Sequence, residues 1–221
     1  MKNGDTRKQN EVAVFSLLEA GLGALHIETS ARQREQLVQL VFLLDHWAAR
    51  INLTGHRDPL AITSHLVLDA AALSQSLIEI SGARSLADLG SGAGFPGLPL
   101  AILHPHLAVA LVDSRLKRNH FQREARRQLG LERVTPILGR AEQLEPALSD
   151  IVIAQAMAKP TRALEMMLRW ARPGALLVLP ASENAQEPPS PPGVGKLSLR
   201  EYNVPGTTTH RKLWVARAHS A

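Results

Sequence analysis

The sequence predicts an α/β fold, in which helices cover a mostly parallel sheet and a helical extension precedes it. Two observations carry this prediction: short apolar runs alternate with helical stretches after residue 84, and an amphipathic segment comes before them. Such alternation is typical of β-α-β units, whose strands run parallel. At 221 residues the chain is long enough for one domain with an appendage. We expect a helical cap over residues 1–66 and the α/β domain over residues 67–221.

The N-terminal extension is predicted from helical periodicity. From residue 31 to residue 51, apolar side chains recur at three- and four-residue spacing and therefore share one face of a helix. Trp47 belongs to this stripe, where a large aromatic side chain is typical of the core. Residues 12–22 show a weaker form of the same pattern. Two helices are therefore expected before the sheet begins.

Five short apolar runs predict strands of the sheet. They are residues 85–89, 107–112, 134–138, 151–154 and 175–179. Two helices are expected between these strands. Residues 115–129 form the first, because Gly130 supplies a C-terminal stop. Residues 161–171 form the second, because Pro173 and Gly174 separate them from the next strand.

The C-terminal part of the chain is predicted to contain an irregular segment and a last strand. The prolines within residues 187–195 lack amide donors and restrict the residues before them. This segment is therefore expected to be an exposed connector. Residues 212–218 are expected to return as an edge strand.

Composition excludes several classes of function. The chain has no cysteine, which excludes disulfides, thiolate metal sites and a cysteine nucleophile. Its nine histidines lack metal-ligand spacing, so no metal is expected. No apolar run approaches the roughly 18 to 20 residues of a membrane span, and a cytoplasmic protein without a membrane partner is expected. The net charge of +5 favours a polyanionic partner only mildly.

A glycine-rich loop, Asp88-Leu-Gly-Ser-Gly-Ala-Gly-Phe-Pro-Gly97, follows the first predicted strand. Its glycines let the backbone approach a ligand, and the pattern fits both a nicotinamide dinucleotide and S-adenosylmethionine. The carboxylate of Asp88 favours the second cofactor. It attracts a cationic amino group and sulfonium, whereas it repels a pyrophosphate. The loop therefore predicts S-adenosylmethionine, bound at Asp88, Gly90, Gly92 and Gly94.

A second carboxylate strengthens this prediction. Asp113 closes the second predicted strand, about 20 residues after the glycine loop, where an acid receives ribose hydroxyls. The alternative is purely structural: Asp88 would cap a turn, and Asp113 with Ser114 would cap the next helix. Two acids at successive strand ends form a more specific signal than either acid alone.

These residues belong to a longer ordered set of motifs. The set comprises Trp47 with Asn52-Leu-Thr54 and Asp58-Pro59, the glycine loop, Leu111-Val-Asp-Ser-Arg-Leu-Lys-Arg118, Gly139-Arg-Ala-Glu142, Asp150-Ile-Val-Ile153 and Arg211-Lys-Leu-Trp-Val215. In these motifs the chain resembles the ribosomal RNA small subunit methyltransferase G family, also called the glucose-inhibited division protein B family.

The resemblance implies a Rossmann-like, seven-stranded class I methyltransferase fold with an N-terminal helical extension. It implies that residues 67–221 form the S-adenosylmethionine-binding domain. The implied reaction is methyl transfer to N7 of one guanosine in the decoding-region loop of 16S rRNA. Cofactor contacts are implied at Gly90, Phe95, Ala141 and Glu142, and the last two residues would border the adenine.

Methyl transfer to N7 fits a site without a catalytic acid–base pair. Guanine N7 is a lone pair with no proton to remove, so the enzyme's task is positioning and electrostatics. Methylation at C5 of a pyrimidine usually requires a cysteine, which is absent. Transfer to an exocyclic amine typically follows an (Asp/Asn)-Pro-Pro-(Tyr/Phe) motif after the fourth strand. This chain has Ala154-Gln155-Ala156-Met157 there.

Three positions depart from the family pattern. Gln155 stands where the family usually has arginine, and Pro180-Ala181 stands where it has Lys-Gly, so two positive charges are absent. His65 and Asp69 lie one residue farther apart than the family's His-x-x-Asp. Gln155 and Arg211 are the candidate catalytic residues. Three functions stay open: a divergent active enzyme, a methyltransferase with another substrate, and an RNA- or ribosome-binding protein of little activity on the same fold.

Basic residues after Asp113 predict a surface for RNA phosphates. They are Arg115, Lys117, Arg118, Arg123, Arg126 and Arg127. A solvated helix face is the common alternative, but the resemblance supports RNA contacts at Lys117 and Arg118. Asn52 and Thr54 fit an RNA or cofactor contact and a capping turn equally well. The expected partner is 16S rRNA or the 30S ribosomal subunit, bound by a monomer.

Overall fold

The computed structural model describes residues 2–155, 158–181 and 184–219. Within these residues a seven-stranded sheet has the order β3-β2-β1-β4-β5-β7-β6. The parallel part comprises β1 (Ser85–Leu89), β2 (Ala108–Asp113), β3 (Val134–Leu138), β4 (Ser149–Ala154) and β5 (Ala171–Ala181). β7 (His210–Arg217) is antiparallel to β5, and β6 (Ser198–Asn203) is antiparallel to β7. The predicted α/β class with a mostly parallel sheet is confirmed.

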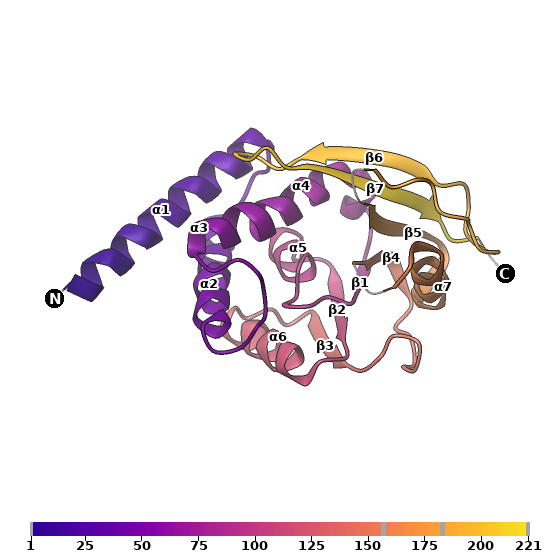
Figure 1. Ribbon diagram of the computed structural model, residues 1–221, viewed down its shortest axis with the longest axis horizontal. Coiled ribbons are helices and arrows are strands. Elements are labelled where there is room, and N and C mark those ends of the chain that lie inside the picture. The colour runs from indigo at the N-terminus through magenta and orange to yellow at the C-terminus, as the bar shows by residue number, and fades with distance from the viewer. Residues whose placement is uncertain (1, 156–157, 182–183, 220–221) are drawn as a thin grey trace.

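Helices cover both faces of the sheet (Figure 1). α4 (Leu68–Ser76), α5 (Gly97–Leu103) and α6 (Leu116–Gln128) pack on one face, and α7 (Pro160–Trp170) packs on the other. Strand side chains alternate between the two faces. Leu86 of β1 therefore joins the apolar cluster of the first face, and its neighbour Ala87 joins the cluster of the second.

The N-terminal helices form an outer layer against α4 and α5. They are α1 (Lys2–Ala24), α2 (Ala31–Ala48), α3 (Pro59–Ile62) and the π-helical turn η1 (Thr63–Val67), and a 3₁₀ turn η2 (Ile78–Ser81) follows α4. Figure 1 shows α1 extending beyond the rest of the molecule. α2 begins at a capping box between Ser30 and Gln33, which satisfies two backbone amides.

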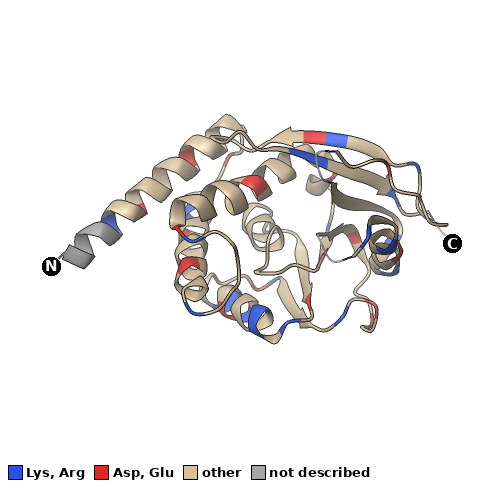
Figure 2. Cartoon of the chain, in the orientation of Figure 1, with Lys and Arg blue, Asp and Glu red and all other residues tan. Residues whose placement is uncertain are grey.

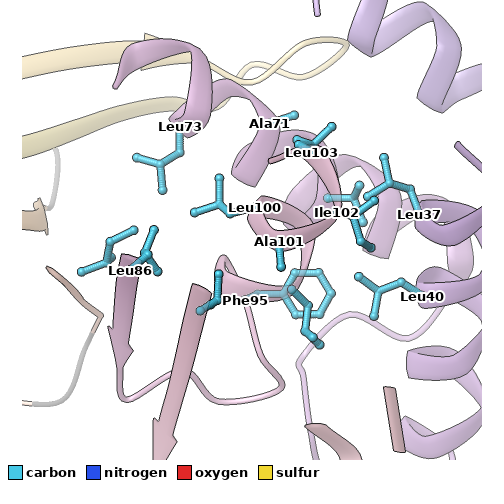
Figure 3. Close-up of a cluster of buried hydrophobic side chains, with 14 of the residues drawn as sticks. Leu37, Leu40, Ala71, Leu73, Leu86, Phe95, Leu100, Ala101, Ile102 and Leu103 are labelled. Atoms are coloured by element: carbon cyan, nitrogen blue, oxygen red, sulfur yellow. The ribbon is translucent and has the colours of Figure 1, made fainter. Parts of the chain in front are cut away.

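The hydrophobic core joins this outer layer to the sheet. Figure 3 shows Leu37 and Leu40 of α2 beside α5, with Phe95 and Leu86 on the side of the strands. One buried apolar cluster contains all four residues. This cluster contains residues from both sides of residue 66. The division into a helical cap and an α/β domain at that residue stays a prediction.

Two predictions for the C-terminal half were wrong. Residues 212–218 are not an edge strand, because they belong largely to β7, which lies between β5 and β6. The edge strand β6 has a polar, largely exposed sequence without an apolar run, so periodicity gives no signal for it. Pro173 and Gly174 lie inside β5 rather than in a turn before it. A register shift against β4 accommodates them, and Gly174 has a φ of 79°.

The other predicted elements are confirmed, with shifted ends. α1 is longer than expected, α2 ends at Ala48, and residues 187–195 connect β5 to β6. Trp47 is partly buried and meets Phe121 of α6 edge to face at 5.7 Å between ring centroids. No helix in the described ranges is long and apolar enough to span a membrane. The described residues also contain no group of three or more His, Asp or Glu side chains that could hold a metal ion.

Candidate active site

The glycine loop between β1 and α5 depends on left-handed backbone conformations. Gly90, Gly92 and Gly94 have φ values of 73°, 59° and 82°, which side chains with a Cβ rarely allow. The amides of Gly90 and Ser91 donate to the carbonyl of Val112 at 2.8 and 3.1 Å. These bonds fix the loop at the carboxyl ends of β1 and β2, the edge where open α/β sheets bind ligands.

Asp88 is fully buried behind this loop. Its Oδ2 accepts a hydrogen bond of 2.9 Å from the amide of Gly97, while its Oδ1 has no donor among the described residues. Burial raises the pKa of Asp88 to about 7; the Gly97 bond opposes this increase and nearby Asp113 adds to it. A buried carboxylate oxygen without a donor is costly, so this residue fits a cofactor that carries a cationic amino group.

Asp113 joins the glycine loop to α6. Its Oδ1 accepts from the amide of Arg115 at 2.8 Å, and its Oδ2 accepts from the amide of Gly92 and from Nη1 of Arg118, both at 3.0 Å. The Arg115 amide belongs to the N-cap residue of α6, and that helix has no side-chain cap, so the cap by Asp113 and Ser114 in the structural alternative is wrong. The Gly92 bond also brings the carboxylate to the loop. Arg118, which was predicted to bind RNA, therefore lies beside Asp113 on the predicted cofactor side of the site.

Gln122 is a loop-binding residue that the sequence did not reveal. Its side chain is fully buried, and its Nε2 donates to Ser91 Oγ at 2.9 Å and to the Gly92 carbonyl at 2.8 Å. The available signal was its position one helical turn after Arg118, on the face of α6 that meets the loop. The basic residues around Gln122 favoured an exposed helix face, so this position was not interpreted as a contact with the loop.

Ala141 and Glu142 lie in the segment that follows β3. The amide of Gly139 donates to the Asp113 carbonyl at 3.1 Å, which joins this segment to the end of β2. Trp170 Nε1 donates to the Ala141 carbonyl at 3.1 Å, and Arg169 Nη1 donates to the Glu142 carbonyl. α7 therefore holds the predicted adenine-binding segment in place.

A cavity of about 260 Å³ lies at the carboxyl ends of β4 and β5. Phe95 and Pro96 of the glycine loop line it, together with Gln155, Pro180 and Arg211. We call this cavity the acceptor pocket. It brings together both predicted catalytic residues, Gln155 and Arg211, and Pro180, which departs from the family pattern. The described pairing of β5 with β4 ends at Val178, so the missing amide of Pro180 does not interrupt that ladder.

Further residues of the acceptor pocket were not predicted as site residues. They are His56, His65, Leu66, Asp69, Ala70, Leu73, Ala181, Tyr202, Lys212 and Leu213. The rings of His56 and His65 stack at 4.9 Å between centroids. Burial, followed by the neighbouring His65, lowers the pKa of His56. The unusual spacing of His65 and Asp69 was the one sequence signal for this group.

The remaining predicted residues lie around these two sites. Asn52 Oδ1 accepts from Arg57 at 3.4 Å, and Thr54 Oγ1 accepts from the His56 amide at 3.2 Å, so both side chains organise the loop that leads to the pocket. Lys117 is exposed on α6. Ala156 and Met157, at the position of the exocyclic-amine motif, lie outside the described residues.

The fold, with the glycine loop at the carboxyl edge of its sheet, is that of the class I S-adenosylmethionine-dependent methyltransferases. Two solved structures share the fold. The first is a SAM dependent methyltransferase from Aquifex aeolicus, with a TM-score of 0.54 and 18% identity over 72% of this chain and 93% of that chain. The second is M. jannaschii TYW2 in complex with AdoMet, with a TM-score of 0.56 and 15% identity over 79% and 80% of the two chains.

Sequence comparison gives the particular family. Residues 33–207 match the GidB family, described as rRNA small subunit methyltransferase G. A protein named Ribosomal RNA small subunit methyltransferase G from Chromohalobacter salexigens is 37% identical over 198 residues, covering 89% of this chain and 93% of the relative. One of the same name from Aeromonas salmonicida is 37% identical over 207 residues, covering 89% and 92%. The chain belongs to the GidB family.

Proposed function

We propose that the protein transfers the methyl group of S-adenosylmethionine to N7 of a guanosine in the decoding-region loop of 16S rRNA. The observation that carries this proposal is the position of Phe95 and Pro96. They belong to the glycine loop and also line the acceptor pocket, so the loop assigned to the cofactor forms part of the wall of the pocket that contains Arg211. The names of the relatives support ribosomal RNA of the small subunit as the substrate.

We assign the cofactor to the edge of the sheet formed by β1, β2 and β3. When bound, it supplies a methyl group on an electrophilic sulfonium. The residues assigned to hold it are Asp88, Gly90, Gly92, Gly94, Phe95, Asp113, Ala141 and Glu142. Asp88 would receive the amino group at the oxygen that has no donor among the described residues, and Asp113 would receive ribose hydroxyls. Arg118 and Gln122 keep the loop and Asp113 in position.

On the acceptor side, the residues orient a base and need not remove a proton. Guanine N7 attacks through its lone pair, so the pocket requires alignment and charge rather than a general base. Arg211 supplies a planar guanidinium that can donate to guanine O6 or to a phosphate. Gln155, which is half-buried at the end of β4, can donate from its amide to O6. These two residues are the proposed acceptor-side residues.

We assign RNA phosphates to the exposed basic face of α6. Figure 2 shows basic residues gathered on this helix. Lys117 and Arg126 are exposed there, and Lys117 remains the residue for which the family resemblance adds support. Asn52 and Thr54 stay proposed RNA contacts. We propose that the protein acts on 16S rRNA, free or within the 30S subunit, as a cytoplasmic monomer.

A methylation assay tests this function. The protein is incubated with methyl-labelled S-adenosylmethionine and with either 30S subunits or naked 16S rRNA from cells that lack the modification. We expect label at N7 of one guanosine, located by mass spectrometry of RNA fragments. An absence of label in both RNA substrates, while a relative from the same family labels them in parallel, would overturn the proposal. Label confined to small molecules would favour a different acceptor.

A further inference from the structure

A carboxylate on α4 binds the cation of the acceptor pocket. Asp69 Oδ2 accepts from Nε and Nη2 of Arg211 at 3.0 and 2.8 Å, and its Oδ1 accepts from the hydroxyl of Tyr202 at 2.8 Å. Both oxygens of Asp69 are therefore occupied. The carboxylate side chain is 17% exposed, whereas Arg211 is 43% exposed. Asp69 thus forms the partly buried base of a group of three residues whose cation is the more exposed to solvent of the ion pair.

The two donors reach Asp69 from directly opposite positions on neighbouring strands. Tyr202 of β6 pairs with Arg211 of β7 in the antiparallel ladder, so their side chains lie on the same face of the sheet. α4 packs against this face and supplies Asp69. Burial, followed by the charge and hydrogen bond of Asp69, raises the pKa of Tyr202, which therefore keeps its proton to donate.

The π-helical turn before α4 explains how this chain accommodates its unusual His65–Asp69 spacing. The amide of Leu68 donates to the carbonyl of Thr63, five residues earlier, so this turn contains one residue more than an α-helical turn. The wider turn absorbs the additional residue before Asp69. As a result, His65 and Asp69 both line the acceptor pocket.

We infer that Asp69, held by Tyr202, is a positioning residue that fixes the guanidinium of Arg211 at the acceptor pocket. This inference rests on the proposed function of that pocket. Nε and Nη2 of Arg211 are committed to Asp69, while Nη1 has no hydrogen-bond acceptor within the described ranges. The Nη1 side of the Arg211 guanidinium is therefore available to donate to a guanine oxygen or a phosphate. The carboxylate of Asp69 also offsets the positive charge of Arg211, which would otherwise repel the purine as methylation at N7 makes it cationic.

A double-mutant cycle tests this role. The variants are Asp69→Asn, Arg211→Gln and the double variant, each assayed for methylation of 16S rRNA. Asparagine keeps the shape but loses one acceptor oxygen and the charge, so the guanidinium is no longer fixed. We expect kcat to fall at least about tenfold, as misplacement of a reacting group typically does, with cofactor affinity unchanged within about twofold. Asp69→Asn is expected to cause no further loss in the Arg211→Gln background.

The matched control is Glu165→Gln, which removes a carboxylate from an exposed ion pair with Arg162 on α7. This variant is expected to retain wild-type kcat. Multiplicative losses from Asp69→Asn and Arg211→Gln in the double variant would overturn the inference. If Asp69→Asn does not fold, Tyr202→Phe takes its place in the cycle, because it removes a single hydroxyl.

A measurement that is independent of activity separates this inference from the proposed function. Nitrogen NMR of the Arg211 side chain reports exchange of its Nε proton with water. We expect a protected proton in the wild type and fast exchange in Asp69→Asn. Equal exchange in both proteins would overturn the positioning role, even if RNA methylation is observed. If the wild type does not methylate RNA, the proposed function fails and this comparison alone decides the role of Asp69.

Discussion

Replacement of Asp88 with asparagine tests the consequence of burying a carboxylate under the glycine loop. The pKa of Asp88 is about 7 in the folded protein, against an ordinary value of 3.8. This difference corresponds to about 4 kcal/mol. The folded protein therefore binds more protons than the unfolded chain between these two values. Its free energy of unfolding consequently falls as pH rises from about 4 to about 7.

Asparagine keeps an oxygen for the Gly97 amide and carries no charge at any pH in this range. The free energy of unfolding of Asp88→Asn, relative to the wild type, is therefore expected to rise by about 3 kcal/mol from pH 4.5 to pH 8. Urea unfolding followed by circular dichroism measures this change in the cofactor-free protein. An unpaired amide adds a constant cost, which leaves the slope unaffected.

The matched control is again Glu165→Gln, because it removes an exposed carboxylate instead of a buried one. Its difference from the wild type is expected to stay nearly flat across this range. A flat difference for Asp88→Asn as well would refute the argument from burial. In calorimetry, we expect Asp88→Asn to bind S-adenosylmethionine at least about tenfold more weakly, since the partner of a cationic amino group is lost.

Two further substitutions test the packing of the glycine loop. Gln122→Met keeps the volume of this buried side chain but removes the donor to two loop acceptors. We expect urea unfolding to show a loss of about 1–3 kcal/mol and calorimetry to show weaker cofactor binding; an unchanged Kd would contradict its role. Gly97→Ala would bring a Cβ within 2.3 Å of Leu111 and 2.9 Å of Asp88 Oδ2. We expect it to lose about 1–3 kcal/mol, whereas Gly23→Ala, exposed on α1 with nothing within 4 Å, is expected to be neutral or stabilising.

The geometry of the glycine loop was largely predictable because it depends on contiguous residues. The glycines of the loop must adopt positive φ, and Asp88 and Asp113 end adjacent strands, so their positions follow from the local pattern and the strand order. The contacts of Gln122 and Arg118 could not be predicted in the same way. Both side chains lie on a helix whose basic composition favours a solvated face, and only packing shows that they face the loop.

The acceptor pocket was predictable only in part. Arg211 came from a matched motif and Gln155 from a departure from the family pattern, but Asp69 and Tyr202 belong to segments more than 100 residues apart in the chain. No local periodicity relates an α4 carboxylate to a β6 hydroxyl. Tyr202 and Arg211 share a face only because β6 pairs with β7. The sequence of β6 has no apolar run from which this strand could be predicted.

By itself the sequence determined the α/β class, the order of most elements and the cofactor loop. Periodicity reports which side chains are buried, and glycine and proline report local backbone conformation; both are properties of neighbouring residues. The tertiary structure decided which polar groups meet. Within the described ranges, it bound Arg118 to Asp113, left one oxygen of Asp88 without a donor, and brought Asp69 to Arg211 through a π-helical turn and an edge strand. These outcomes depend on long-range packing, which local patterns do not encode.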